Sequence, residues 1–99
     1  MTTFKELYSD DDGTFYEELY PLAEKYLILG KHQLQSYIQD AKQKEWDVIR
    51  NALISISSDM CFHYLHRTLQ RCKSPTSINY ANISLAIERS IQRHNRHCQ

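Results

Sequence analysis

Residues 31–72 read KHQLQSYIQDAKQKEWDVIRNALISISSDMCFHYLHRTLQRC and contain neither glycine nor proline. Apolar side chains recur along this stretch at steps of three and four residues, which is the spacing of one face of a helix. A single helix over it would be about 60 Å long at 1.5 Å per residue, which is too long for a globule of this size. The stretch therefore predicts helices separated by a break. We expect the break in the polar segment 40–47, with 55–59 as the second choice.

An unbroken central helix is the alternative, and its apolar length would then need a second chain to cover it. On this interpretation the segment from Leu34 to Leu69 is the self-association face of a homodimer. Tyrosine and tryptophan are favoured in interface centres, because they combine a large apolar body with a polar group. The side chains expected in the interface are Tyr37, Trp46, Ile49, Leu53, Ile56, Met60 and Tyr64.

A further helix is expected on the N-terminal side of this stretch. Thr14 and Glu17 form a capping-box pattern at its start, where each side chain can pair with a free backbone N–H group. Gly30 marks its expected end, because glycine readily adopts the left-handed conformation that closes many helices. Pro21 removes a backbone hydrogen bond, so it either kinks this helix or begins a separate one.

A last helix is expected after the sequence KSPTS at 73–77, which predicts a loop. Proline keeps the residue before it out of the helical region, and serine and threonine favour turns and caps. The apolar spacing that follows predicts a helix from Ile78 to about His94.

Composition agrees with long helices, since 99 residues include only two glycines and two prolines. This argues against a linker or a many-turned β-sandwich. The predicted architecture is all-α, a small bundle of three to four helices that forms one domain over residues 1–99. Its ends are an acidic N-terminal segment at 1–12 and a frayed tail at 95–99.

The expected location is cytoplasmic, with no membrane partner. No apolar run at the N-terminus resembles a secretion signal, and no stretch has the length of a membrane span. The three cysteines (Cys61, Cys72 and Cys98) are an odd number and do not form a disulfide framework, which favours a reducing compartment.

Charge is segregated along the chain, although its net value is zero. Residues 1–24 carry seven acids and one lysine, a net charge of −6, and residues 25–99 carry eleven bases and five acids, a net charge of +6. This predicts either a basic surface for an acidic partner or an acidic segment that folds back on that surface. The acidic candidates are Asp10, Asp11, Asp12, Glu17 and Glu18, and the basic candidates are Arg67, Arg71, Lys73, Arg89, Arg93 and Arg96.

The acidic candidates include a motif, because residues 10–14 read DDDGT. This resembles the Asp-x-Asp-Gly-Thr nucleophile motif of haloacid-dehalogenase-like phosphotransferases, in which the motif follows a buried strand. The preceding FKELYS has no strand pattern, and no second acidic motif follows. A calcium loop fails on spacing, since with Gly13 as its sixth position the first and last ligands would be Tyr8 and Leu19. Acids before a helix are instead explained by the favourable field at its N-terminus.

Histidines and cysteines provide weak candidates for a metal site. His63 and His66 lie three residues apart and His94 and Cys98 four apart, so each pair could share a helix face and together supply four zinc ligands. No Cys-x-x-Cys pattern occurs, and the neighbours of His63 and His66 have the pattern of core residues. We therefore expect no cofactor and no enzymatic activity, with structural zinc as a minor alternative.

The resulting functional prediction is a small non-enzymatic helical protein that acts by binding another protein, as a regulator, adaptor or inhibitor and as a homodimer. The alternative is a nucleic-acid-binding transcriptional regulator that uses the basic C-terminal helix. Arg89, Arg93 and Arg96 lie along one side of that helix, and arginine can both grip phosphate and read bases.

Overall fold

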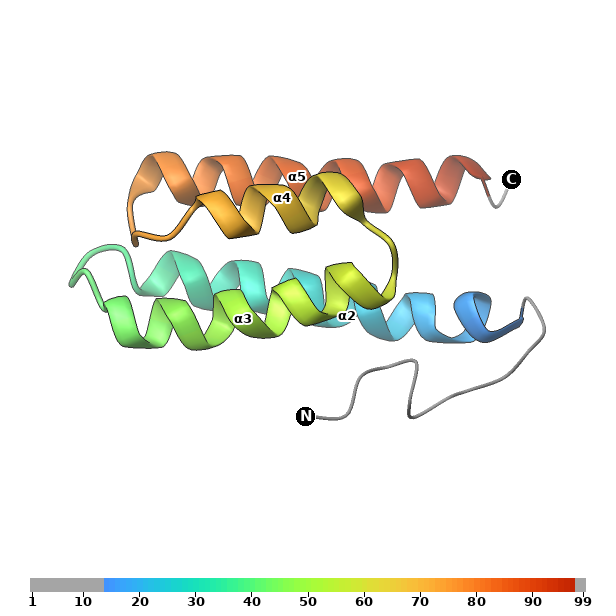
Figure 1. Ribbon diagram of the computed structural model, residues 1–99, viewed down its shortest axis with the longest axis horizontal. Helices are drawn as coiled ribbons and strands as arrows, with labels where there is room; N and C mark the ends of the chain where they lie inside the picture. The colour runs from blue at the N-terminus through green and yellow to red at the C-terminus, as the bar shows by residue number, and fades with distance from the viewer. Residues whose placement is uncertain (1–13, 98–99) are drawn as a thin grey trace.

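The computed structural model describes the backbone of residues 14–97 and the side chains of residues 19–93 (Figure 1). The helices are α2 (Thr14–Ser36), α3 (Gln43–Asp59), α4 (His63–Arg71) and α5 (Ser77–His97). No strand occurs between residues 14 and 97, so the prediction of an all-α bundle of three to four helices is confirmed. Within the same part of the chain, no helix has an apolar run long enough to cross a bilayer.

The four helices run alternately in opposite directions and form two hairpins, α2–α3 and α4–α5 (Figure 1). α2 and α4 each pack against both α3 and α5, which closes the helices into a ring. Apolar side chains from all four helices meet inside this ring, as the spacing of one helix face requires. The buried core consists of Leu27, Leu34, Trp46, Leu53, Leu65, Leu69, Cys72, Ile83, Ala86 and Ile87.

A second, smaller cluster fixes the first part of α2. Leu19, Tyr20 and Ala23 are buried against Met60, with Phe62 packed beside them. The Tyr20 hydroxyl donates a hydrogen bond to the backbone carbonyl of Ile91 in α5 at 3.1 Å. The N-terminal part of α2 is therefore held against both the α3–α4 turn and the C-terminal half of α5.

The central stretch breaks twice, once overlapping the first expected region and once directly after the second, which is itself helical, so the long central helix does not form. Residues 37–42 connect α2 to α3, and residues 60–62 connect α3 to α4. The first break lies a few residues before the centre of the predicted segment 40–47. The second lies a few residues after the centre of the segment 55–59. Because the chain turns back twice, the apolar length of the stretch is covered by its own helices, and it no longer requires a second chain.

Both breaks use the same backbone geometry without glycine. Ala41 and Cys61 have φ angles of 49° and 59°, in the left-handed region. The N–H groups of Lys42 and Phe62 each bond the carbonyl five residues earlier, at 3.0 and 2.8 Å, and the N–H groups of Ala41 and Cys61 bond the carbonyl three residues earlier. This pair of bonds defines a Schellman motif, which terminates a helix.

The prediction that the first helix ends by Gly30 is wrong. α2 continues through Gly30 to Ser36, and Pro21 lies within it. Gly30 is buried against α3, where an added Cβ atom would lie 2.7 Å from Leu53 Cδ2 and 3.1 Å from Leu53 Cγ. The glycine therefore allows the close approach of α2 and α3 rather than ending a helix.

This contact predicts that Gly30→Ala lowers the free energy of unfolding by about 1 kcal/mol, because the overpacking cost of about 1–3 kcal/mol exceeds the gain in helix propensity of about 1 kcal/mol. In a Leu53→Ala background the obstructing atoms are gone, so the same change is expected to raise stability by about 1 kcal/mol. Urea denaturation of the four proteins measures this cycle. An equal effect of Gly30→Ala in both backgrounds would contradict the account.

The left-handed residues predict a stabilising change at each turn. Ala41→Gly and Cys61→Gly are each expected to raise the free energy of unfolding by about 0.5–1 kcal/mol, since relief of the left-handed backbone outweighs the extra entropy of glycine in the unfolded chain. The matched control is Ala52→Gly in the exposed interior of α3, where about 1 kcal/mol should be lost. Thermal and urea denaturation measure whether each variant is more or less stable than the parent. A loss of stability in all three variants would contradict the presence of Schellman motifs at the two turns.

Candidate functional site

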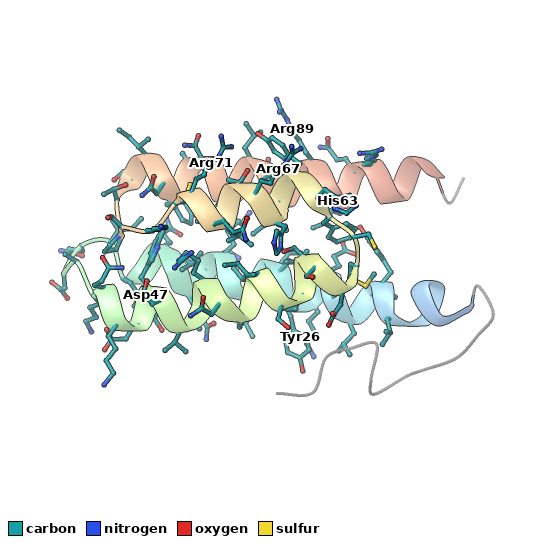
Figure 2. The ribbon with its side chains drawn as sticks, in the orientation of Figure 1. Tyr26, Asp47, His63, Arg67, Arg71 and Arg89 are labelled. Atoms are coloured by element: carbon teal, nitrogen blue, oxygen red, sulfur yellow. The ribbon has the colours of Figure 1, made fainter. Side chains whose placement is uncertain are left out.

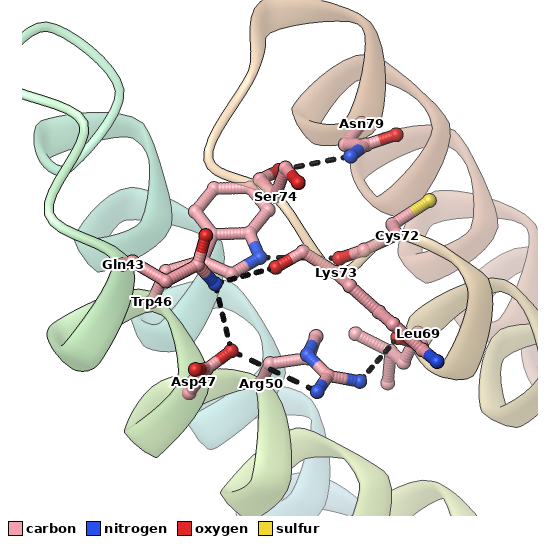
Figure 3. A network of polar contacts seen from close by, with 9 residues as sticks. All are labelled: Gln43, Trp46, Asp47, Arg50, Leu69, Cys72, Lys73, Ser74 and Asn79. Atoms are coloured by element: carbon pink, nitrogen blue, oxygen red, sulfur yellow. Dashed lines mark hydrogen bonds and ion pairs between the residues drawn. The ribbon is translucent and has the colours of Figure 1, made fainter.

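The C-terminal end of α4 is held by side chains from one face of α3 (Figure 3). Trp46 Nε1 donates to the Cys72 carbonyl at 3.1 Å, and Arg50 Nη1 donates to the Leu69 carbonyl at 3.0 Å. Gln43 Nε2 donates to the carbonyl of Lys73 at 2.7 Å. The last carbonyl groups of a helix lack partners within it, and Arg50 supplies one to Leu69. Trp46 and Gln43 bind the carbonyls of the two residues that directly follow α4. We call Gln43, Trp46 and Arg50 the α3 donors.

Asp47 connects two of the α3 donors. Its Oδ1 atom accepts a hydrogen bond from Gln43 Nε2 at 3.0 Å and lies 3.7 Å from Arg50 Nη2. These contacts orient both side chains toward α4. Trp46 is fully buried, so its indole N–H group is satisfied only by the Cys72 carbonyl, and the end of α4 is fixed in register with α3.

The loop after α4 is connected to the start of α5 by two short-range bonds. Asn79 Nδ2 donates to the Ser74 carbonyl at 2.8 Å, and the Asn79 backbone N–H group donates to Thr76 Oγ1 at 3.1 Å (Figure 3). Thr76 thus caps α5 three residues before Asn79, in the manner typical of threonine at a helix N-terminus. The predicted loop at 73–77 agrees with this segment, since α5 begins at Ser77.

With α4 and α5 fixed, their outward sides form a surface rich in arginine. Tyr64, Arg67 and Arg71 are exposed at i, i+3 and i+7 positions of α4, and Leu85, Arg89 and Arg93 are exposed at i, i+4 and i+8 positions of α5. The Arg89 guanidinium lies 5.9 Å from the centre of the Tyr64 ring, which joins the two rows. Figure 2 shows Arg67, Arg71 and Arg89 on the α4–α5 half of the molecule. We call these six side chains the arginine face.

The arginine face has no compensating carboxylate among the described side chains, residues 19–93. Two ion pairs in this part of the chain are Lys31–Glu88 at 3.7 Å and Arg50–Asp47, and neither involves an arginine of the face. Glu88 is the only acid between residues 62 and 97, and its pairing with Lys31 directs it toward α2. The positive charge is therefore exposed, and it surrounds two exposed apolar groups, Tyr64 (42% exposed) and Leu85 (43%).

The remaining predicted charged residues fall partly outside this surface. Lys73 is exposed in the loop after α4. Arg96 belongs to the backbone of α5, and Glu17 and Glu18 to that of α2, but their side chains lie outside the described residues, as do Asp10, Asp11 and Asp12 entirely.

The side chains predicted for a self-association face are mostly used within the chain. Trp46, Leu53 and Met60 are buried in its own two apolar clusters. Ile49, Ile56 and Tyr37 are half-buried against the same clusters, and Tyr64 is exposed on the arginine face. Apolar spacing identified these residues as packing residues, and the structure places their partners in the same chain.

The weak zinc candidates do not meet in the described region. His63 is exposed at the start of α4, while His66 is half-buried with its Nδ1 atom unpartnered. No group of three or more His, Cys, Asp or Glu side chains able to hold a metal ion occurs among the described residues. The side chain of His94 and the whole of Cys98 lie outside them.

The two cysteines of the described region differ in environment. Cys61 is exposed in its turn, and Cys72 is buried beneath Trp46. Burial raises the pKa of the Cys72 thiol, against the opposing effect of the Arg71 and Arg50 charges. The contribution of Cys72 to folding stability is therefore fully present at pH values below the pKa of an unfolded cysteine, about 8.5. It is lost as the pH rises through the higher pKa of the folded state, because the unfolded chain can then release the proton more readily.

This difference predicts distinct reactivity in a Cys98→Ser variant. Cys61 should react with a thiol reagent at the rate of a free cysteine. Cys72 should react only as fast as the core opens, because burial disfavours its thiolate and keeps the reagent away from the sulfur atom. Stability should also fall less steeply at alkaline pH when Cys72 is replaced by alanine, relative to the parent. Equal labelling rates for both thiols in the folded protein would contradict the structure.

Sequence reasoning missed two features of this region. Leu85 was not expected on the same surface as the arginines. It lies four residues before Arg89, and this spacing indicates that the two side chains share one face of the helix. The roles of Gln43 and Arg50 had no signal, because their acceptors are backbone carbonyls on another helix.

Comparison with known proteins adds no family to these observations. No protein-family model, no curated protein and no solved structure matches the chain.

Proposed function

We propose that this chain is a small non-enzymatic helical protein that binds an acidic segment of another protein through the arginine face. The observation that carries the proposal is the pairing of exposed, uncompensated arginines with exposed Tyr64 and Leu85 on adjacent helices. Exposed charge alone is common on a solvated helix. Charge around apolar groups is the composition of a recognition surface, because the apolar groups gain from being covered.

The chemistry of the face indicates the kind of partner. A guanidinium group binds a carboxylate through two parallel hydrogen bonds and is weakly hydrated, so arginine is well suited to interfaces. Tyr64 and Leu85 offer exposed apolar area, one in each row of the face. A partner segment that combines several Asp or Glu side chains with apolar ones, on one side of a helix or an extended strand, would satisfy both requirements.

The shape of the face favours protein over nucleic acid. It is formed by two antiparallel helices lying side by side (Figure 2), and each helix with its side chains is about 10–12 Å across. A major groove about 12 Å wide admits one helix and not a pair. The neutral net charge of the chain also gives little general attraction to phosphate. Nucleic acid remains the second candidate, supported by the same four arginines.

The predicted homodimer stays a prediction. Its place on this structure would be the exposed apolar side chains of the α2–α3 hairpin, Tyr26, Leu29 and Val48, since the central apolar stretch is covered within the chain. Sedimentation velocity over a range of concentrations tests it, and a monomer throughout that range would contradict it.

Binding to an acidic peptide tests the proposed function. A glutamate- and leucine-rich amphipathic peptide is expected to bind the full chain, more weakly at high salt. The triple variant Arg67→Gln, Arg71→Gln, Arg89→Gln should lose about 3- to 100-fold in affinity, since exposed ion pairs contribute about 0.2–1 kcal/mol each. Calorimetry or fluorescence anisotropy measures the change.

The matched control is Lys25→Gln, Lys42→Gln, Lys44→Gln, which removes the same charge from exposed positions on the other hairpin. It should leave the affinity within about twofold of the parent. Equal losses in both triple variants would show general electrostatic attraction and contradict a specific face. Tighter binding of duplex DNA than of the peptide, lost in the arginine variant, would favour the nucleic-acid candidate instead.

A further inference from the structure

We propose that the acidic N-terminal segment of this chain, residues 1–13, binds the arginine face of the same molecule and competes there with the partner. The proposal rests on the proposed function, because it assigns a built-in competitor to the same surface. Three observations carry it: where α2 begins relative to the face, the charge of the segment, and the length of chain available.

Tyr20 holds the start of α2 against α5, at the end of the bundle where the arginine face contains Tyr64 and Arg93. Its hydroxyl bonds the Ile91 carbonyl at 3.1 Å, and Ile91 packs against the core on the side of α5 away from Arg89 and Arg93, which are two residues before and after it. Its ring packs edge-on against Phe62, with centroids 6.2 Å apart, and Phe62 directly precedes α4. α2 therefore begins at the end of the bundle where α4 begins and α5 finishes (Figure 1).

The charge of the segment complements that of the face. Residues 1–13 contain four acids and one lysine, a net charge of −3, against four arginines on the face. The segment also contains aromatic residues, Phe4 and Tyr8, which match the apolar character of Tyr64 and Leu85. Its composition thus resembles the acidic and partly apolar partner that the face requires.

The available length is sufficient. The thirteen residues before Thr14 span at most about 45 Å when extended. The α5 row of the face, from Arg93 to Leu85, is about 12 Å long at 1.5 Å per residue. The segment can therefore lie along the whole row, and a short tether of this kind gives an effective concentration in the millimolar range.

The expected effect is partial competition rather than complete closure. Exposed ion pairs contribute about 0.2–1 kcal/mol each, so a few of them give the segment only a weak affinity for the face. The dissociation constant of this contact is then comparable to the effective concentration of the segment. The affinity of the face for an external acidic peptide should then fall about 3- to 10-fold in the intact chain.

The test replaces the charges of the segment without changing its length. Asp10→Asn, Asp11→Asn, Asp12→Asn removes three acids from it. The control Glu24→Gln, Asp40→Asn, Glu45→Gln removes three acids from the α2–α3 hairpin, where none of them makes a described hydrogen bond or ion pair. Affinity for the glutamate- and leucine-rich peptide should rise about 3- to 10-fold in the first variant and less than twofold in the control.

Backbone amide spectra of the peptide-free proteins give an independent readout. Residues of α4 and α5 on the arginine face should shift in the Asp10–Asp12 variant and remain unchanged in the control. The shifts should be the same in dilute and concentrated samples, since the contact is within one molecule. Shifts that grow with protein concentration would mean that the segment binds a second copy, and would overturn the proposal.

The outcomes separate this proposal from the one on which it rests. If the peptide binds the parent and both variants equally and the α4–α5 amides do not move, the proposed function stands and the competing segment is overturned. If the peptide binds no protein and those amides do not move, both are overturned. Movement of those amides in the Asp10–Asp12 variant alone supports the segment, whether or not that particular peptide binds.

Discussion

The hydrogen bonds that the α3 donors make to Leu69 near the end of α4 and to the two residues after it are the constraint on which the arginine face depends. α4 has only nine residues, and isolated helices of that length are unstable in water. Its register is set from outside, by Gln43, Trp46 and Arg50 on successive turns of α3. A carbonyl group that loses its partner at an exposed site can bond water instead, whereas one at a buried site cannot. Loss of the hydrogen bond from the buried Trp46 indole therefore has the largest free-energy cost of the three.

Fixing α4 also determines which charges are exposed. Arg50 turns inward to the Leu69 carbonyl and Asp47, while Arg67 and Arg71 point away from α3. On α5, Glu88 pairs with Lys31 of α2, which leaves Arg89 beside Tyr64 on the opposite side. The segregation of charge along the sequence thus becomes a segregation between surfaces, and a basic face is formed on a chain with no net charge.

Local patterns in the sequence predicted the all-α bundle, the first break and the loop before α5, and they placed the second break a few residues too early, because spacing and proline act over a few residues. They did not predict the use of Gly30, since its role is set by Leu53 on another helix. The left-handed residues Ala41 and Cys61 carry no sequence signal, because non-glycine residues seldom occupy that conformation. Apolar spacing identified Trp46 as a packing residue but could not tell whether its partner lay in the same chain or a second one. The basic candidates were identified from composition, while their arrangement as one face required the Tyr64–Arg89 contact.

The central claim is that one face of the α4–α5 hairpin recognises acidic protein segments. Titration of the isotope-labelled chain with an acidic amphipathic peptide, followed by backbone amide spectra, tests it residue by residue. The account predicts saturable shifts concentrated at residues 63–71 and 85–93, with α3 and the outer side of α2 unaffected. Shifts spread evenly over both hairpins, or centred on Tyr26, Leu29 and Val48, would contradict it.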